Sequence, residues 1–459
     1  MTTYREEFDS IGAKLVPQEA YYGVQSLRAL ENFHITGRKL HNQFVIAIVE
    51  LKKAAALTNK EVGVYDEGIA NAIITACDEI LAGKFLDNFI TDAVQGGAGT
   101  SANMNANEVI ANRAIELLGG TKGDYHIVHP NDHVNCGQST NDVIPSAGRI
   151  ATIRLLSQAI ASLKRLKRAF ESKAEEFNSI IKMGRTEMQD AVPISFGQVF
   201  GAFASALDRD IKRFSLAIEE MSTLNMGATA IGTSINAHPE YVKAIAKNIR
   251  KVTGICVTQA ADLVDATQNL DSFVFVSGII KSCAVTLSKI ANDIRLMSSG
   301  PRTGFEEIYI PPKQNGSSIM PGKVNPVMPE VMSQIAYNII GNDTTITLAA
   351  EAGQLELNAY EPVIFYRLFE SLDTLRNGVE VFRSECIEGI TVNISKCRND
   401  VESSIGIITV LCTKIGYTQA ALIAKRALRE GKSLRQVLLE ENILSEDEVD
   451  QLLDPSKMV

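Results

Sequence analysis

Apolar residues recur at helical spacing through long stretches of the chain that contain no proline. None of the thirteen prolines falls in the stretches 146–192, 240–300 and 363–454, and an interior proline costs a helix about 3 kcal/mol. In the first stretch an apolar residue recurs every seven positions, at Leu156, Leu163, Phe170 and Phe177. This spacing predicts a long helix with one face packed in a bundle.

The stretch 263–297 is apolar on nearly every side, and Gly278 is its only helix breaker. A helix of this kind must be buried, and a single chain seldom buries it at this length. We therefore expect it to pack against copies of itself in a symmetric oligomer. Two further long helices are predicted at 327–352 and 362–387, which completes a central bundle.

Alternating strand-like runs are nearly absent, so we expect an all-α fold without a large sheet. Loops are predicted at 117–145, 182–193, 226–239 and 298–326. The last is long enough to be functional. A chain of 459 residues exceeds the size of one hydrophobic core. We expect an N-terminal helical domain at 1–140, a central long-helix domain at 141–395 and a small C-terminal helical domain at 396–459, whose last helix opens on a capping box from Ser445 to Glu448.

The net charge is -9, which argues against nucleic-acid binding and against a basic membrane-binding surface. An anionic substrate must then be held by a local cluster of donors. We find neither a signal-peptide pattern nor an apolar run long enough to span a bilayer. The seven cysteines are scattered without a CxxC pair, which indicates reduced thiols, a cytoplasmic location and no structural zinc.

Three polar, glycine-bearing segments interrupt the helical pattern at 96–108, 137–142 and 316–326. They offer hydrogen-bonding side chains that suit a carboxylate: Thr100, Ser101 and Asn103; Ser139, Thr140 and Asn141; Ser317, Ser318, Lys323 and Asn325. Short clusters of this kind commonly cap helices, and that alternative stays open for the first two. The third is an unusual cap, because it places two glycines, two serines and a lysine in one long loop.

The third segment, GSSIMPGKVNP, resembles the signature of the aspartase/fumarase superfamily. The other two segments match that family's remaining substrate-contact regions in the same order. The likeness to the aspartase branch extends almost end to end, through AYYGVQSLRALENFHITG, NANEVIANRA, HVNCGQSTND, GRTEMQDAVP, NMGATAIGT, PGKVNPVMPEV and EAGQLELNAYEPV. Fumarases usually have Lys-Pro in place of Glu361-Pro362 and Thr-Gln in place of Val327-Met328, so both positions favour the amino-acid lyases.

The resemblance implies three helical domains, a homotetramer with a shared core of long helices, and active sites each built from three subunits. It implies elimination of ammonia from L-aspartate to give fumarate, with no cofactor and no metal. Ser317 would be the general base that removes the Cβ proton, activated by Lys323 and backbone donors. The resemblance assigns the substrate contacts as follows: Thr100, Ser139, Thr140 and Ser318 to the carboxylate that becomes the aci-anion; Thr186, Lys323 and Asn325 to the other carboxylate; Asn141 and Glu187 to the amine.

Three positions depart from the family pattern. Glu187 stands where relatives carry His or Gln, Gly137 stands where the aspartase pattern has Ser, and Cys412-Thr413 replaces Asn-Pro. Since Glu187 would lie beside the leaving amine, a related lyase that expels another amine stays open. Ergothionase, which releases trimethylamine, is an example. Fumarase is a further alternative.

A non-catalytic helical scaffold would have no need to keep Ser317, Lys323 and Asn325, so we consider this reading less favoured. His133 fits the support of a loop better than catalysis. His126 and His129 have metal-like spacing without a third ligand in sight, and we therefore predict no metal site.

Overall fold

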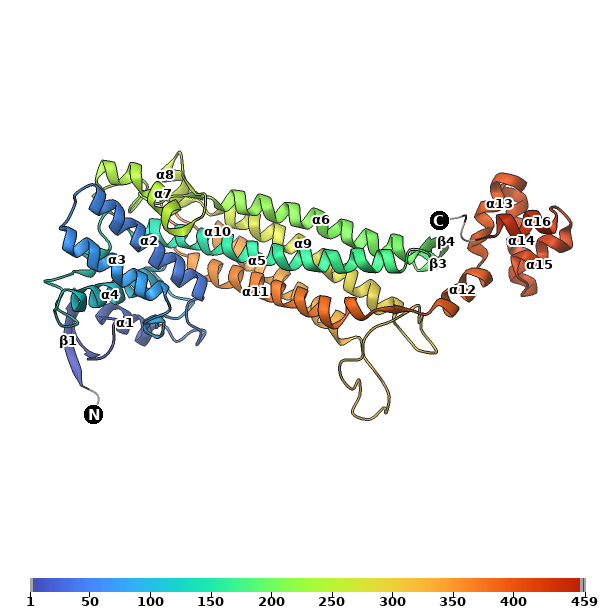
Figure 1. Cartoon of the computed structure of the whole chain (residues 1–459), viewed down its shortest axis with the longest axis horizontal. Coiled ribbons are helices and arrows are strands. Elements are labelled where there is room, and N and C mark those ends of the chain that lie inside the picture. The colour runs from blue at the N-terminus through green and yellow to red at the C-terminus, as the bar shows by residue number, and fades with distance from the viewer. Residues whose placement is uncertain (1–2, 455–456, 458–459) are drawn as a thin grey trace. The chain divides into compact units, whose positions relative to one another are not determined.

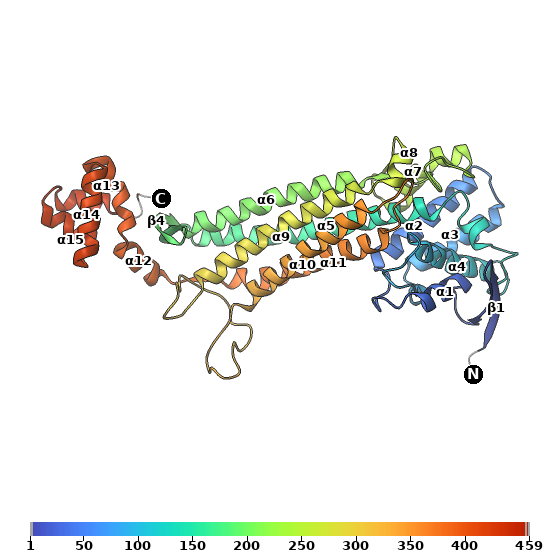
Figure 2. The same cartoon turned by 180° about the vertical axis from the view of Figure 1, so that it is seen from behind.

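The structure is a computed structural model that describes residues 3–454 and residue 457, and it is mostly helical (Figures 1 and 2). The first part of the chain forms β1 (Tyr4–Asp9), β2 (Gly12–Pro17), α1 (Val24–Asn32), α2 (Asn42–Glu61), α3 (Glu67–Leu81), the 3-10 turn η1 (Leu86–Asn88), α4 (Thr100–Leu117), the π-helical turn η2 (Pro130–Val134) and α5 (Thr140–Glu176). The middle part forms β3 (Ile181–Thr186), β4 (Gln189–Ser195), α6 (Phe196–Met221), β5 (Thr223–Leu224), α7 (Pro239–Thr253), β6 (Thr258–Gln259), α8 (Leu263–Gln268) and α9 (Asp271–Met297).

The last part forms β7 (Ile308–Tyr309), α10 (Val327–Glu351), α11 (Glu361–Glu385), the 3-10 turn η3 (Ile387–Gly389), β8 (Thr391–Val392), α12 (Ile394–Ser403), the 3-10 turn η4 (Ile405–Ile407), α13 (Ile408–Ile415), α14 (Tyr417–Glu430), α15 (Leu434–Glu441) and α16 (Glu446–Leu452). In the described part of the chain every sheet has two strands, and only β5 and β6 pair in parallel. The expectation of an all-α fold without a large sheet is confirmed. The capping box that opens α16 is also present.

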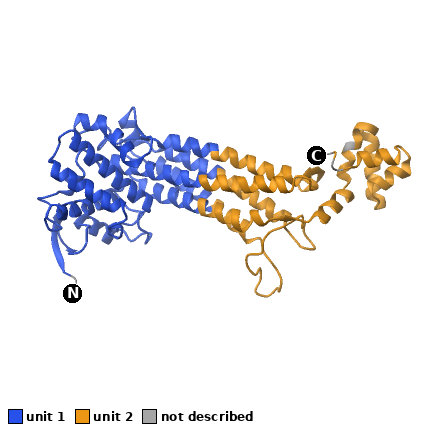
Figure 3. Ribbon diagram, in the orientation of Figure 1, with its two compact units in different colours: residues 1–160, 212–282, 338–375 blue, residues 161–211, 283–337, 376–459 orange. Residues whose placement is uncertain are grey.

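The chain divides into two compact units (Figure 3). Unit 1 comprises residues 1–160, 212–282 and 338–375, and unit 2 comprises residues 161–211, 283–337 and 376–459. The division falls inside five long helices: α5, α6, α9, α10 and α11. The three-domain division at residues 140 and 395 stays a prediction.

Each unit has its own apolar core. In unit 1, α2 packs on α3 and α7, and three phenylalanines, Phe44, Phe365 and Phe369, meet with ring centroids 5.2–5.8 Å apart. In unit 2, Phe170 and Phe177 pack against Phe200 of α6. The predicted apolar stripe with its spacing of seven residues is buried: Leu156, Leu163 and Phe170 lie in α5, and Phe177 follows the end of that helix.

The long helices were predicted well, with one exception. α10 and α11 begin and end within two residues of the predicted positions. The stretch 263–297, however, is two helices, because Asn269 adopts an extended conformation between α8 and α9. The Asn269 side chain donates to the Asp265 carboxylate 2.7 Å away. A local bond of this kind competes with the helical backbone pattern.

Three predicted loops contain regular structure, and in the segment 298–326 it is the short strand β7. The segment 182–193 forms most of the β3–β4 hairpin. The segment 117–145 contains η2 and the start of α5, with Pro145 inside that helix. A proline has no N–H to give to the carbonyl four residues earlier, here Asn141. The Asn225 side chain donates to that carbonyl instead, at 3.0 Å, so α5 can begin five residues before the proline.

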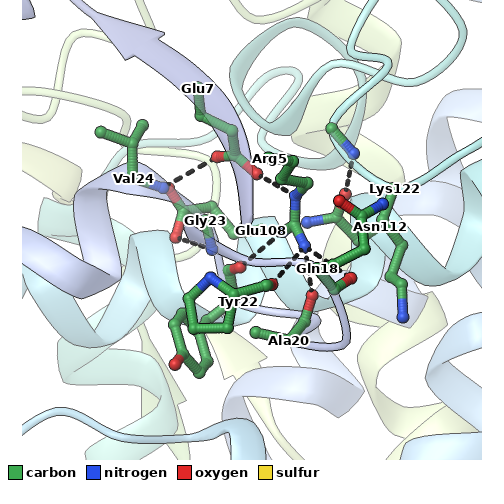
Figure 4. A network of polar contacts seen from close by, with 12 residues as sticks. Arg5, Glu7, Gln18, Ala20, Tyr22, Gly23, Val24, Glu108, Asn112 and Lys122 are labelled. Carbon is green, nitrogen blue, oxygen red and sulfur yellow. Dashed lines mark hydrogen bonds and ion pairs between the residues drawn. The ribbon is translucent and has the colours of Figure 1, made fainter. Parts of the chain in front are cut away.

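The N-terminal hairpin β1–β2 was also missed, because its polarity is inverted. Arg5 and Glu7 are buried while Tyr4 and Phe8 are exposed. Figure 4 shows why the charged side chains point inward: Arg5 donates to Glu7 and to backbone carbonyls, and Glu7 accepts from the N–H of Val24. Buried charges that are paired and hydrogen-bonded are tolerated in a protein interior.

α9 is long and apolar enough to cross a membrane by length and composition alone. Its most apolar window has a mean hydropathy of 1.6, and 56% of that window is buried within the chain. The buried core helix of a folded domain passes the same test, so this length and composition do not by themselves indicate a membrane span. Within unit 1, Ser277 and Lys281 of α9 both donate to Asp343 of α10, as polar side chains of a packed core helix do.

Candidate active site

Two helices begin side by side in unit 1, each at a residue of a predicted substrate segment. Thr100 is the first residue of α4, and Thr140 is the first residue of α5. The side chain of Asn103, in the first turn of α4, donates to the Thr140 hydroxyl at 3.2 Å. Helix N-termini carry unpaired N–H groups and partial positive charge, which attract anions. The paired N-termini therefore suit a carboxylate in a chain whose net charge is negative.

The buried side chain of Asp142 holds the backbone of the segment 137–142 in position. Its buried carboxylate accepts from the N–H groups of Ser139, Gly227 and Thr229 at 2.8–3.1 Å. Burial raises the pKa of Asp142 to about 6, although these hydrogen bonds oppose the rise. The carboxylate thus joins the start of α5 to the loop at 226–239, so both backbones have a defined position.

Lys52 of α2 supports the same segment and was not singled out from the sequence. Its fully buried ammonium donates to Asn135 Oδ1 at 2.8 Å and to Gln138 Oε1 at 3.0 Å. Burial lowers the pKa of Lys52 to about 7, against the attraction of Asp142. The sequence did contain a signal for this role. Lys52 stands in the apolar stretch of α2 that ends in KKAAAL, and a lysine buried there requires polar partners.

Asn141 has a fixed orientation. Its Nδ2 donates to the carbonyl of Ala230 at 2.7 Å. The amide nitrogen is thereby used within the fold, and Oδ1 is the atom left to a ligand. An ammonium group needs an oxygen acceptor of this kind. Thr100 donates its hydroxyl to the carbonyl of Gly97 at 2.8 Å, so that hydroxyl must rotate before it can donate to a substrate carboxylate.

In unit 2, the loop 316–326 closes on itself around Ser317. The N–H of Gly316 donates to the carbonyl of Lys323 at 2.7 Å, and Asn325 Nδ2 donates to the carbonyl of Gly316 at 2.7 Å. A Cβ on Gly316 would lie 2.5 Å from the Lys323 carbonyl oxygen. Glycine is therefore required at this close approach.

Ser317 Oγ accepts from two backbone N–H groups, those of Ile319 at 3.2 Å and Met320 at 3.0 Å. Hydrogen bonds to a charged form stabilise it, so this arrangement favours an alkoxide on Ser317. The Lys323 side chain is exposed. It can therefore reach a substrate carboxylate.

Thr186 and Glu187 lie at the tip of the β3–β4 hairpin. The two turn residues, Glu187 and Met188, have φ values of 51° and 65°, as a type I′ turn requires. Glycine and asparagine are the usual residues there. A side chain in this left-handed region costs roughly 1–2 kcal/mol, and such strain persists mainly at functional sites. The turn points Glu187 into solvent within this chain.

Glu307 supports the hairpin from inside unit 2. Its fully buried carboxylate accepts from Arg185 at 2.6 Å and lies 3.2 Å from the ammonium of Lys182. Ser404 donates to Asp190 of β4 at 2.8 Å, which ties the C-terminal helices to the same hairpin. These contacts hold Thr186 in place although the residue itself is exposed.

The predicted residues thus fall into three groups, each brought together by the fold. Unit 1 gathers Thr100, Ser139, Thr140 and Asn141; one loop of unit 2 carries Ser317, Ser318, Lys323 and Asn325; one turn of unit 2 carries Thr186 and Glu187. That the three groups form one site stays a prediction.

His129 and His133 have structural roles. His133 Nδ1 accepts from the N–H of His129 at 2.8 Å, and His129 caps η2 through the N–H groups of Asn131 and Asp132. Burial lowers the pKa of His133. Within residues 3–454 and 457, no group of three or more His, Cys, Asp or Glu side chains has the arrangement of a metal site.

The chain is similar to known proteins along almost its whole length. A family model described as Lyase matches residues 12–341, and one described as Fumarase C C-terminus matches residues 407–459. The chain is 51% identical to an aspartate ammonia-lyase of Bacillus subtilis over 99% of this chain and 96% of that protein. It is 48% identical to one from Escherichia coli, over 99% and 96% of the two chains.

Solved structures agree in fold. A fumarate lyase:delta crystallin from Brucella melitensis matches with a TM-score of 0.97 and 46% identity, covering 99% of both chains. A class II fumarase from Schistosoma mansoni matches with a TM-score of 0.95 and 33% identity, again over 99% of both chains.

Proposed function

The chain belongs to the Lyase family, and from this premise we propose that it is an aspartate ammonia-lyase, which eliminates ammonia from L-aspartate to give fumarate. The observation that carries the proposal is the full-length likeness to aspartate ammonia-lyases of several bacteria. Glu361-Pro362 and Val327-Met328 support the amino-acid lyase over fumarase, since both positions depart from the fumarase pattern.

The chemistry is a proton abstraction followed by loss of the amine. Ser317, as the alkoxide, removes a Cβ proton from L-aspartate, and the electrons move into the adjacent carboxylate to give an aci-carboxylate dianion. The Cα–N bond then breaks, the double bond of fumarate forms and ammonia leaves. The two N–H groups that donate to Ser317 Oγ support the role of this residue as base. The steps involve proton transfer and charge stabilisation only, so we propose that no cofactor is used.

Each part of the substrate is bound by residues from two of the three groups. Thr100, Ser139, Thr140 and Ser318 bind the carboxylate that becomes the aci-anion, where the N-termini of α4 and α5 add positive charge. Thr186, Lys323 and Asn325 bind the second carboxylate. Asn141 and Glu187 face the amine, and the oriented Oδ1 of Asn141 supports that role.

We further propose a homotetramer in which three subunits supply each site. Ile319 in the site loop is 84% exposed in the single chain, and Tyr337 and Leu348 of α10 are 59% and 63% exposed. Large apolar side chains exposed together mark surfaces that a partner covers. Phe275 and Val285 give α9 a similar exposed face.

The seven cysteines, all within the described part of the chain, form no disulfide, which supports a location in the reducing cytoplasm.

A second candidate is a lyase that expels a quaternary amine, and Glu187 is the observation that favours it. A carboxylate at the tip of the hairpin attracts a permanent positive charge without needing an N–H donor. L-Aspartate stays the primary substrate proposed, because the full-length relatives carry that name.

The decisive assay follows fumarate absorbance with L-aspartate, with a trimethylammonium betaine and with L-malate in parallel. We expect turnover of L-aspartate by the wild type and almost none by Ser317→Ala. Turnover of the betaine with none on L-aspartate would overturn the proposed substrate. Conversion of L-malate alone would identify a fumarase.

Sharing of the site between subunits is tested with hybrids. Ser317→Ala and Thr186→Ala tetramers are each inactive by the proposal, and mixing them after reversible dissociation should restore part of the activity. The reason is that some hybrid sites receive both intact residues from different chains. Hybrids shown to form by mass spectrometry, yet without activity, would contradict shared sites.

A further inference from the structure

The first turn of α5 is joined to the segment that follows β5 by three sets of hydrogen bonds, all within unit 1. Asp142 and the side chain of Asn141 make two of them. Asn225 makes the third, because its Nδ2 donates to the backbone carbonyl of Asn141 at 3.0 Å. Asn225 is 2% exposed, whereas Asn141 is only half-buried. An effect of Asn225 on a substrate therefore passes through Asn141.

The carbonyl of Asn141 needs a donor from outside the helix because Pro145 stands four residues later. In a regular helix the N–H of residue 145 would donate to this carbonyl, and proline has no N–H. A buried acceptor without a partner carries a desolvation penalty. The bond from Asn225 removes this penalty and keeps the first turn of α5 in a helical conformation.

The amide of Asn225 has a defined orientation. A carbonyl oxygen only accepts, so Nδ2 is the atom that faces Asn141. The second hydrogen of Nδ2 goes to Thr267 Oγ1 at 3.2 Å, and Oδ1 accepts from Ser146 Oγ at 3.1 Å. Both of these partners are almost fully buried. The amide is therefore held on three sides and has one position.

The contacts proposed for the carboxylate have supports of their own. The Thr140 hydroxyl accepts from Asn103, and the N–H of Ser139 donates to Asp142. The amide of Asn141, in contrast, is oriented by its bond to the carbonyl of Ala230 and by the backbone that Asn225 holds. Loss of Asn225 should therefore affect recognition of the amine more than recognition of the carboxylates.

We propose that Asn225 is a positioning residue for the amine of the substrate. It holds the backbone of Asn141 so that Oδ1 of that residue meets the ammonium group of L-aspartate. The inference rests on the proposed function, which takes Asn141 as the contact to the leaving amine. Because Oδ1 is an acceptor, the arrangement favours a primary ammonium group, which has N–H donors, over a quaternary one.

The first test compares a substrate that carries the amine with a ligand that lacks it. In Asn225→Ala we expect kcat/KM for L-aspartate to fall about tenfold, the scale of one lost buried hydrogen bond. The inhibition constant of succinate, which has both carboxylates and no amine, should change less than about twofold, since the carboxylate contacts keep their supports.

Asn248→Ala is the matched control. Asn248 is also a buried asparagine of unit 1, and its Nδ2 donates to Thr58 and Glu61 at 2.9 Å. This variant should lower Tm as Asn225→Ala does, while leaving both kinetic constants near the wild-type values. Asn225→Ser, a milder change that keeps one donor, gives the same comparison if Asn225→Ala does not assemble.

The second test restores the missing donor from inside the helix. Pro145→Ala supplies an N–H four residues after Asn141, so the carbonyl regains its regular helical partner. Pro145→Ala alone should have nearly wild-type kcat/KM because Asn225 still donates. The double variant Asn225→Ala/Pro145→Ala should recover to within about threefold of the wild type. A cavity at position 225 would not be repaired by a change at position 145.

Two results would overturn the proposal against an active wild type. Equal losses for L-aspartate and succinate in Asn225→Ala would show that Asn225 supports the whole segment rather than the amine contact. A double variant no more active than Asn225→Ala would show that the carbonyl of Asn141 is not the group through which Asn225 acts. Absence of L-aspartate turnover by the wild type would overturn the proposed function and this inference with it, so the two failures are distinguishable.

Discussion

The two units contribute to the proposed active site in contrasting ways. In unit 1 the residues around Ser139 and Thr140 rest on buried groups, with Asp142 and Lys52 hydrogen-bonded beneath them. In unit 2 the proposed base Ser317 lies on an exposed loop and Glu187 lies on an exposed turn. In the unit 1 segments the left-handed positions are held mainly by glycines, Gly97, Gly99 and Gly137, with Ala98 the exception, whereas the unit 2 turn places Glu187 and Met188 there.

This contrast indicates that the two units have different roles in the proposed site. Rigid, fully bonded groups provide binding energy in a fixed geometry, which favours a stable carboxylate pocket. Groups on an exposed loop can move to exclude water once substrate is bound. We therefore expect substitutions in unit 2 to change turnover while leaving stability intact, and substitutions beneath the unit 1 segments to change both.

The largest effect is expected at Ser317. Ser317→Ala removes the proposed base and should lower kcat by about 10² or more, with an unchanged Tm because the loop is exposed. Ser318→Ala is the matched comparison: it removes one contact to the carboxylate that becomes the aci-anion, so it should also lower kcat, but less than Ser317→Ala does. Turnover in Ser317→Ala comparable to the wild type would remove Ser317 from the mechanism.

Asp142→Asn tests the buried support in unit 1. An amide cannot accept three N–H donors as the carboxylate does, so we expect kcat/KM to fall by roughly tenfold to a hundredfold through loss of about 1–3 kcal/mol of hydrogen bonding. Unlike Ser317→Ala, it should also lower Tm. Thermal melts and steady-state kinetics on the same preparations measure both. Wild-type Tm together with wild-type kcat/KM would contradict a supporting role.

The buried side chain of Lys52 should make the free energy of unfolding depend on pH. Its pKa of about 7 in the folded state lies below the value of about 10.4 in an unfolded chain. Between these two values the unfolded state holds more protons, so this group makes stability rise with pH. The Tm of the wild type relative to Lys52→Met should therefore increase from pH 7 to pH 9. Lys53→Met, which removes a neighbouring surface ammonium paired with Asp78, should show no such trend.

Glu187→Gln should have a smaller effect. With L-aspartate, a carboxylate beside the ammonium strengthens ground-state binding but hinders departure of neutral ammonia, so a neutral amide serves nearly as well. We expect kcat/KM to change a few-fold. With a trimethylammonium substrate the loss would be roughly 30-fold to 1,000-fold, because electrostatic attraction is then the main recognition. Parallel assays on the two substrates separate these outcomes.

The long helices could be predicted from sequence because their signal is repeated many times. Leu156, Leu163, Phe170 and Phe177 all report the same buried face, and α10 and α11 were located within two residues. The break at Asn269 was missed because it depends on a single side-chain bond to Asp265. The start of α5 was misplaced for a related reason, since the partner that satisfies Asn141 is Asn225, 84 residues away.

The candidate site residues were predicted by resemblance to a family. The buried side chains that support them, such as Lys52, were not predicted. Periodicity has no means of pairing Lys52 with Asn135, which lies 83 residues later. The inverted hairpin was missed because burial of Arg5 and Glu7 depends on partners such as Val24 and Tyr125 elsewhere in the chain. Buried polar networks combine distant residues, and local patterns carry little information about them.

The smallest expected effect concerns two residues with positive φ, Met188 in the unit 2 turn and Gly137 in unit 1. Met188 is 57% exposed and has a φ of 65°, so its side chain packs little while its backbone is strained. Met188→Gly removes the steric cost of the left-handed conformation, and the greater freedom of glycine in the unfolded chain offsets part of that gain. We expect a net stabilisation of about 0.5–1 kcal/mol, seen as a small rise in Tm, with kcat unchanged. Gly137→Ala makes the opposite change in unit 1, at a φ of 70°, and should lower Tm by a similar amount. A lower Tm for Met188→Gly would show that the hairpin turn is not strained, and a loss of kcat would show that the Met188 side chain itself supports the site.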